Sequence, residues 1–305
     1  MTNYFAQTSE DCFKNIENFS YKVNYMRGGL GLKEEYNGFK IAYIDENNLG
    51  KNGVLLFIHG HPTWSYLWRH LIPFGLKHDY RVISIDLPGF GRSDKPLKKE
   101  FFNFTTYRNV ILSFIKNLNL KNITLFLHEW GGTLGLTLPM EQKNLYNGLV
   151  LFNSYLGTSV GNITEGYQNW INTNIKSEAL NIRALMARTN RILNLSECNA
   201  YEAPFAEKEH KISLRMLPSI FPINADMNGY DVCDSSLEWW EENSLNKVLV
   251  IGGARDPLVS IEKIKALSKI ISSDGQTHVI NNAGHFVPEW GMEFGEELFE
   301  QLKPE

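Results

Sequence analysis

The chain lacks the features that mark membrane, secreted and nucleic-acid-binding proteins. No apolar run reaches the ~18 residues of a membrane-spanning helix. The first residues contain neither the basic nor the apolar segment of a secretory signal. With a net charge of −4 and no cluster of lysine and arginine, the chain offers no basic surface to nucleic acid or to an anionic membrane. We therefore expect a cytoplasmic protein that binds neither partner.

Cysteine is also scarce. The three cysteines, Cys12, Cys198 and Cys233, are far apart, odd in number and without the spacing of metal ligands. Free thiols are therefore expected, rather than a disulfide or a zinc site. The sequence gives no indication of a metal ion or another cofactor.

The chain does contain a repeated alternation of strand and helix patterns over its 305 residues. Apolar runs typical of buried strands alternate with segments of helical periodicity, as in α/β domains. The expected strands lie at 39–45, 53–59, 81–86, 123–128 and 148–153, then from 247 and at 277–280. The first of these is expected to be an antiparallel edge strand. Helices are expected at 65–76, 105–118, 133–140 and 261–271, and from 292.

The strand pattern stops between residues 154 and 240, where the segments are compatible with helices and rich in Asn, Glu and aromatic residues. We therefore predict an α/β fold with a mostly parallel central sheet flanked by helices. Its core domain comprises residues 1–153 and 241–305. A helical cap domain, residues 154–240, is inserted into it.

The run that begins at Ile123 ends in a sharp, glycine-assisted turn at Glu129. This pattern is typical of a nucleophile elbow, the strand-to-helix turn that lifts a reactive side chain above the sheet of an α/β-hydrolase. The nucleophile position holds Glu129 instead of Ser or Cys. A carboxylate is already charged at pH 7 and needs no activating base, so this position indicates an alkyl-enzyme ester rather than an acyl-enzyme.

Glu129, Asp256 and His285 follow one another in the order nucleophile, acid and base of an α/β-hydrolase. Each lies at the carboxyl end of an expected strand, where open α/β sheets place their sites. The sequence therefore predicts a catalytic triad on an α/β-hydrolase fold.

Four stretches of the chain resemble the haloalkane dehalogenases, and the resemblance extends over nearly the full length of the chain. They are His59-Gly-His-Pro-Thr-Trp-Ser-Tyr-Leu-Trp-Arg69, the segment from Asp86 to Pro96, the segment from Asn122 to Met140, and Asn282-Ala-Gly-His-Phe286. The cap matches less closely, around residues 200–205. The resemblance implies that a small apolar haloalkane is hydrolysed and a halide ion released, without a cofactor. We expect a monomer or a small homo-oligomer.

The resemblance also implies a role for each matching residue. Glu129 occupies the position that the family fills with Asp. His285 would activate water against the ester, and Asp256 would orient its imidazole. Some family members carry the acid after the preceding strand, but that position here is Asn153, which cannot serve, so Asp256 is preferred.

Trp130 would donate its indole N–H to the departing halide, and Trp170 in the cap would be the second donor. The backbone N–H groups of His61 and Trp130 would form the oxyanion hole. Positions that line the family's substrate pocket match Tyr167, Leu217, Phe221 and Leu258. Ordinary packing explains each of these four equally well, and it is also an alternative for Trp170.

Two positions depart from the family pattern. At position 61 the family usually has Asn or Glu, and His61 would change the charge of the pocket while keeping the backbone N–H. At position 129, Glu reaches one methylene further than Asp. A misplacement of roughly 1 Å costs on the order of 10²-fold in rate, so we expect weak or absent dehalogenation. The longer carboxylate is also expected to reach His285 and bond it directly.

Two other functions remain open at this stage. The same site suits an epoxide hydrolase, which needs an acid for the alkoxide; Tyr155, Tyr167 and Tyr201 are present, but their spacing does not favour that role. A catalytically silent relative that binds small apolar ligands is the third possibility. The sequence does not decide whether Glu129 reflects another reaction, residual activity or a laboratory substitution.

Overall fold

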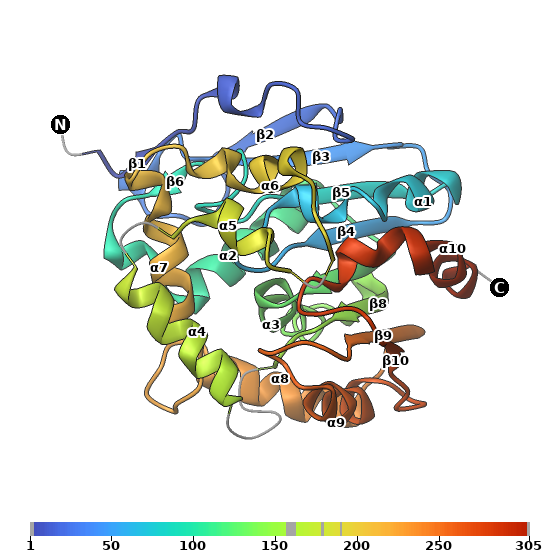
Figure 1. Ribbon diagram of the computed structural model, residues 1–305. Coiled ribbons are helices and arrows are strands. Elements are labelled where there is room, and N and C mark those ends of the chain that lie inside the picture. Colours follow the sequence, from blue (N-terminus) through green and yellow to red (C-terminus); the bar gives the residue numbers. More distant parts are fainter. Residues whose placement is uncertain (1–2, 157–162, 178–179, 190, 304–305) are drawn as a thin grey trace.

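The computed structural model describes residues 3–156, 163–177, 180–189 and 191–303. Its centre is an eight-stranded sheet with the order β10-β9-β8-β7-β4-β5-β3-β2 (Figure 1). Its strands are β2 (Val23–Arg27), β3 (Lys40–Glu46), β4 (Val54–Ile58), β5 (Arg81–Ile85), β7 (Ile123–His128), β8 (Tyr146–Phe152), β9 (Lys247–Gly253) and β10 (His278–Ile280). The strands from β10 to β5 in this order run parallel to one another. The mostly parallel sheet is therefore as predicted.

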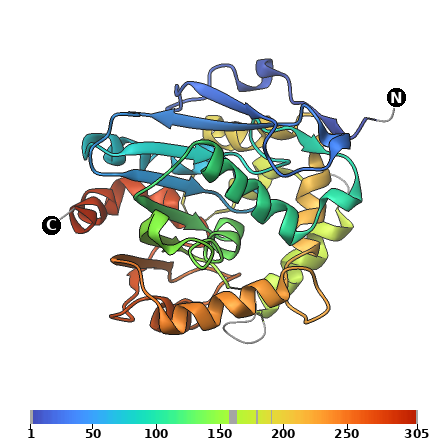
Figure 2. The same cartoon turned by 180° about the vertical axis from the view of Figure 1, so that it is seen from behind.

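A short antiparallel pair, β1 (Phe5–Ala6) and β6 (Lys95–Pro96), lies outside this sheet. All the residues of β4 and β7 are buried, because both strands are internal and helices cover the two faces of the sheet. One face carries α1 (Ile72–Lys77) and α10 (Gly291–Leu302). The other carries α2 (Phe104–Asn117), α3 (Trp130–Gly135) and α8 (Tyr230–Glu242), with α9 (Ile261–Ile271) packed beside α8 (Figure 2).

Three local predictions differ from the structure. β3 is antiparallel as expected, but it is not an edge strand, because β2 pairs along its outer side. The helix expected over 65–76 is a 3₁₀ turn at Ser65–Trp68 followed by α1, which starts at Ile72 with Pro73 in its first turn. Proline has no N–H to donate within a helix and therefore favours a helix start. The helix expected over 133–140 is α3, which begins directly after Glu129 and ends before Pro139.

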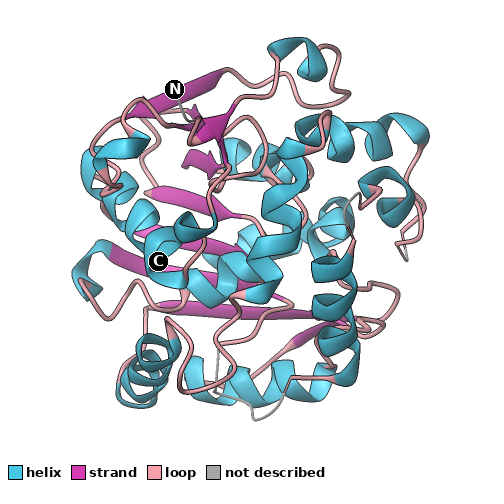
Figure 3. Cartoon of the chain, turned by 90° about the vertical axis from the view of Figure 1, so that its left-hand side faces the viewer, coloured by secondary structure: helices cyan, strands magenta, loops and turns pink. Residues whose placement is uncertain are grey.

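The segment between β8 and β9 contains no strand in its described residues. Its first helices are α4 (Glu165–Lys176), α5 (Ile182–Met186), α6 (Leu195–Glu202) and α7 (Ile212–Ser219). They lie beside the end of the sheet where the parallel strands finish, whereas the strands themselves form one stack with helices on both sides (Figure 3). Because β8 and β9 are neighbours, the segment is an insertion that leaves the strand order unchanged.

The last part of this insertion, α8, contacts the core. Ser236 and Trp240 both donate hydrogen bonds to the carbonyl of Leu136, at 2.9 Å each. The division into a core of 1–153 and 241–305 and a cap of 154–240 stays a prediction.

None of the helices in the described ranges combines the length and the apolar character needed to cross a membrane. The three cysteines are free thiols.

Candidate active site

The turn after β7 places Glu129 in a strained backbone conformation, with φ 49° and ψ −115°. Two glycines make this turn possible. A Cβ on Gly131 would lie 2.0 Å from the carbonyl oxygen of Ile58, and a Cβ on Gly60 would lie 2.5 Å from the Cβ of Glu129. A positive φ in a buried, non-glycine residue is typical of functional sites. The geometry is that of the predicted nucleophile elbow.

The carboxylate of Glu129 is buried and makes three hydrogen bonds. Its Oε2 accepts from the backbone N–H groups of His61, at 2.7 Å, and Trp130, at 2.5 Å. Its Oε1 accepts from the hydroxyl of Tyr167, at 2.8 Å. The two backbone donors expected to form an oxyanion hole therefore converge on one oxygen of Glu129.

Burial raises the pKa of Glu129 above its ordinary value, and the nearby His285 and the three hydrogen bonds only partly offset this. Burial lowers the pKa of His61 to about 3, so this ring is uncharged at neutral pH. The Nε2 of His61 lies 2.9 Å from the carbonyl oxygen of Leu214 and is therefore the protonated nitrogen. His61 thus connects the elbow to α7 without adding a charge.

His285 and Asp256 meet at the carboxyl ends of β10 and β9. The Nδ1 of His285 lies 2.9 Å from Oδ2 of Asp256, and the backbone N–H of Leu258 donates to Oδ1 at 2.7 Å. Asn153 also donates its side-chain amide to Oδ2, and its own oxygen accepts from the N–H of Gly253 at 2.8 Å. Asn153 therefore positions the acid, a role that the sequence did not indicate.

The Nε2 of His285 is buried and has no hydrogen-bond partner among the described atoms. The expected direct bond between this ring and Glu129 is absent from the described contacts, because the longer side chain bonds Tyr167 and the two backbone N–H groups instead. Burial lowers the pKa of His285, but the Asp256 charge and hydrogen bond outweigh it, and the net shift is upward. The free nitrogen leaves His285 able to accept a proton from water.

The two tryptophans expected to hold a halide differ in their surroundings. Trp130 is fully buried, and its indole N–H has no partner among the described atoms. A buried N–H without a partner is rare, and it suits an anion that arrives during a reaction. Trp170 on α4 is half-buried, and its ring lies 5.6 Å from the ring of His61.

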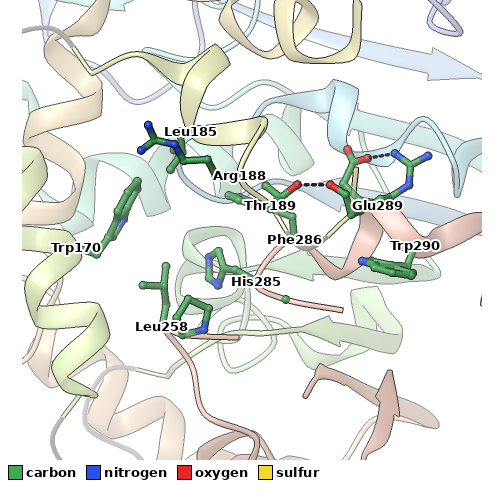
Figure 4. Close-up of a pocket in the computed structure, with 12 residues that line it drawn as sticks. Trp170, Leu185, Arg188, Thr189, Leu258, His285, Phe286, Glu289 and Trp290 are labelled. Carbon is green, nitrogen blue, oxygen red and sulfur yellow. Dashed lines mark hydrogen bonds and ion pairs between the residues drawn. The ribbon is translucent and has the colours of Figure 1, made fainter. Parts of the chain in front are cut away.

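A cavity of about 180 Å³ opens beside His285. Figure 4 shows Trp170 and Trp290 at opposite ends of this pocket, with His285 between them in that view. Its apolar lining comes from Trp170, Leu185, Pro257, Leu258, Phe286 and Trp290, and its polar lining includes Arg188, Thr189, Arg191 and Glu289. Of the four residues expected to line the substrate pocket, Leu258 lines this cavity and the other three do not.

The other three expected pocket residues lie deeper. Tyr167 bonds Glu129, and Phe221 packs against the rings of Trp130, at 5.3 Å, and Tyr167, at 5.0 Å. Leu217 is fully buried on α7, which packs against α4. The cavity does not include Glu129 in its lining.

A buried ion cluster joins the core to the cap beside this cavity. Arg69 pairs with Glu289 through both guanidinium nitrogens, at 2.5 and 2.7 Å, and with Glu197 at 2.8 Å. Arg191 also pairs with both carboxylates. Ligand atoms of His70, Glu197 and Glu289 lie within 4.8 Å of one another, but the two arginines already neutralise these carboxylates. We therefore interpret the group as an ion cluster rather than a metal site.

Comparison with known proteins identifies the fold and the family of the chain. Residues 53–292 match the family model of the alpha/beta hydrolase fold. A haloalkane dehalogenase of Mycobacterium marinum is 30% identical over 303 residues, which cover 97% of this chain and 98% of that relative. The chain belongs to the haloalkane dehalogenase family. The haloalkane dehalogenase of Psychrobacter cryohalolentis is 29% identical over 93% of this chain and 92% of its own length.

Solved structures of haloalkane dehalogenases superimpose on the chain. The tetrameric haloalkane dehalogenase DpaA of Paraglaciecola agarilytica does so with a TM-score of 0.90 and 33% identity, over 96% of this chain and 97% of that one. Haloalkane dehalogenase DbeA of Bradyrhizobium elkani has a TM-score of 0.75 over 92% of this chain and 98% of that one; at 22% identity it supports the fold alone.

Membership of the haloalkane dehalogenase family confirms three predictions: the α/β-hydrolase fold, the family itself and the assignment as a hydrolase enzyme. The roles of individual residues remain predictions. Two contacts within this dehalogenase site were missed, namely the Asn153 bond to Asp256 and the Tyr167 bond to Glu129. The position of Asn153 at the end of a strand could have indicated its bond to Asp256. The bond between Tyr167 and Glu129 depends on how the cap packs, and no local pattern indicates it.

Proposed function

We propose that this haloalkane dehalogenase relative displaces halide from small haloalkanes through an ester on Glu129. One observation carries the proposal. Two backbone N–H groups donate to Oε2 of the Glu129 carboxylate and fix its orientation. The other oxygen, Oε1, therefore points towards Tyr167 and the cap. An oxygen so directed suits an attack on carbon from a fixed position.

In the first step, Oε1 of Glu129 forms a bond to the halogen-bearing carbon, and the carbon–halogen bond breaks with its electron pair on the halide. The unpartnered indole N–H of Trp130 stabilises the halide, and Trp170 supplies the second donor. The apolar lining of the cavity beside His285 favours an apolar substrate.

In the second step, Nε2 of His285 takes a proton from water, and the water oxygen attacks the carbonyl carbon of the ester. The negative charge develops on Oε2, where the N–H groups of His61 and Trp130 already point. Asp256 stabilises the imidazolium, which then gives its proton to the departing alcohol. The second water proton, left on the carboxyl group of Glu129, passes to solvent, so the products are the alcohol, the halide and one proton. These steps use water and protein groups alone.

We infer further that the enzyme acts in the cytoplasm as a monomer or a small homo-oligomer. The tetrameric relative DpaA supports an oligomer.

The test compares this protein with its Glu129→Asp and His285→Ala variants on 1-bromobutane and 1,2-dibromoethane. We expect slow halide release by the unaltered protein and an increase on the order of 10²-fold in the Asp variant, because the shorter side chain corrects the reach. His285→Ala should accumulate an alkyl ester on Glu129, visible by peptide mass spectrometry. If the unaltered protein releases no halide, the proposed function is wrong, even if the Asp variant is active.

A further inference from the structure

His128 is a buried histidine beside the nucleophile that the two proposed steps do not use. It is the last residue of β7, directly precedes Glu129, and is fully buried. Its Nε2 lies 2.9 Å from the backbone carbonyl oxygen of His285. A carbonyl only accepts hydrogen bonds, so Nε2 carries the proton and donates it. The residue before the nucleophile is thus bonded to the residue that would activate water.

This bond reaches across the sheet. β8 and β9 lie between β7, which ends at His128, and β10, which precedes His285. Asp256 fixes the ring of His285 through Nδ1, and His128 fixes the backbone of the same residue. The preceding carbonyl, that of Gly284, accepts from the side chain of Asn153 at 3.3 Å. Side chains at the ends of β7 and β8 therefore hold the loop that carries the base.

Packing alone does not account for a histidine at this position. The Nδ1 of His128 is buried and has no hydrogen-bond partner among the described atoms. Such a nitrogen costs stability, whereas a phenylalanine would fill the space without that cost. The ring lies 5.1 Å from the ring of His285 and 5.9 Å from that of Phe286, and a phenylalanine could keep both contacts. The bond made by Nε2 is what distinguishes a histidine from an apolar residue here.

We infer that His128 is a positioning residue for water activation, because its N–H holds the backbone of His285 so that Nε2 of this base faces the ester on Glu129. This role rests on the proposed function in one respect, since the ester is formed in its first step. The nucleophile itself is oriented by the backbone N–H groups of His61 and Trp130. Loss of the His128 bond should therefore slow hydrolysis of the ester and leave its formation unchanged.

The charge state of His128 suits this role. Burial, and secondly the neighbouring His285, lower the pKa of His128 well below its ordinary value. The ring therefore stays neutral at the pH at which the base works, and its single proton stays on Nε2. A neutral ring also places no second positive charge beside the imidazolium that forms during hydrolysis. The bond to the carbonyl of His285 thus persists through both steps.

The test follows the two steps separately in the unaltered protein, His128→Phe and His128→Gln, with 1-bromobutane as the substrate. Bromide released in the first turnover reports ester formation, and peptide mass spectrometry of quenched samples reports decay of the ester. His128→Phe should form the ester at the unaltered rate and hydrolyse it about 10²-fold more slowly, the cost of a misplacement of about 1 Å. His128→Gln provides a side-chain N–H donor and should largely restore hydrolysis. The control is His78→Phe, which replaces a ring that stacks on Phe299, and it should change neither step.

Three results of this comparison would overturn the role of His128. They are hydrolysis at the unaltered rate in His128→Phe, an equal slowing of both steps in that variant, and a His128→Gln variant as slow as His128→Phe. Absence of bromide release by the unaltered protein would instead overturn the proposed function.

NMR tests the position of the base without turnover. The signal of the Nδ1 proton of His285, which reports the bond to Asp256, should shift in His128→Phe and return in His128→Gln. An unchanged signal in His128→Phe would contradict the positioning role. If His128→Phe does not fold, nitrogen NMR of the unaltered protein decides: His128 should carry its proton on Nε2 alone at neutral pH, and a proton on Nδ1 would overturn the role.

Discussion

The Nδ1 of His285 lies 2.9 Å from Oδ2 of Asp256, although 29 residues separate them along the chain. The contact fixes which nitrogen of the ring carries the proton, because the carboxylate accepts from Nδ1 and leaves Nε2 free for water. The base of the proposed reaction is thus prepared by its partner before any substrate binds.

The first prediction concerns pH. Burial alone would lower the pKa of His285, but Asp256 and Glu129 raise it above the ordinary value of about 6.5. Because the neutral imidazole is the active form, halide turnover should be high at alkaline pH and fall as the pH drops through this raised pKa. A profile of kcat against pH should have its acid midpoint above about 6.5. A midpoint below that value would contradict the assigned role of His285.

The second prediction separates two buried indoles. The N–H of Trp130 has no described partner, whereas that of Trp240 donates to Leu136 at 2.9 Å. Trp130→Phe should lower kcat/KM for halide release by about 10²-fold, the cost of removing one donor to a developing anion, with little loss of stability. Trp240→Phe should instead lower the melting temperature and leave kcat/KM for halide release unchanged. Equal effects of the two changes on activity would show that Trp130 only fills space.

The third prediction concerns the amide that positions Asp256. Asn153→Ala removes a donor to Asp256 and the acceptor for the N–H of Gly253, and should cost about 1 to 3 kcal/mol of stability. With less compensation of the Asp256 charge, the pKa of His285 should rise, and the acid midpoint should move to higher pH. Asn147→Ala, which removes an exposed partner of Asn246, is the control. An unchanged midpoint in Asn153→Ala would limit Asn153 to a structural role.

The fourth prediction concerns the ion cluster between core and cap. The side chains of Arg69 and Glu289 are each 1% exposed. Arg69→Met leaves a buried carboxylate with fewer partners and should destabilise the protein by about 3 to 5 kcal/mol, measured by denaturant unfolding. Lys77→Met, in an exposed pair with Glu296, should leave the transition unchanged. If Arg69→Met and Lys77→Met both changed the free energy of unfolding only slightly, Arg191 alone would suffice to neutralise the two carboxylates.

The strands and the site that they present were predictable from local patterns. β4, β7 and β8 are uniformly apolar runs, and Glu129, Asp256 and His285 follow strands in a recognisable order. A strand buried on both faces has no polar side, so its sequence marks its position in the middle of a parallel sheet. The family resemblance predicts the same positions through a different kind of similarity.

The remaining features depend on tertiary contacts. β2 has only partly buried and exposed residues, so nothing local distinguishes it from a loop, and its pairing with β3 is visible only in the sheet. The bond between Tyr167 and Glu129 joins residues 38 positions apart and depends on how α4 lies over the elbow. The extra methylene of Glu129 is visible in the sequence, whereas the direction of its carboxylate is set by the backbone N–H groups that hold it.

The insertion between the neighbouring strands β8 and β9 divides the two halves of the chemistry between separable parts of the chain. His285, Asp256 and Trp130 lie on loops and a helix that follow the strands of the sheet, whereas Tyr167 and Trp170 belong to α4 of the inserted segment. Exchange of the inserted segment among relatives would therefore change the residues that face Glu129 from the cap and keep Asp256, His285 and Trp130 in place. New substrates are thus open to this scaffold by recombination as well as by point mutation.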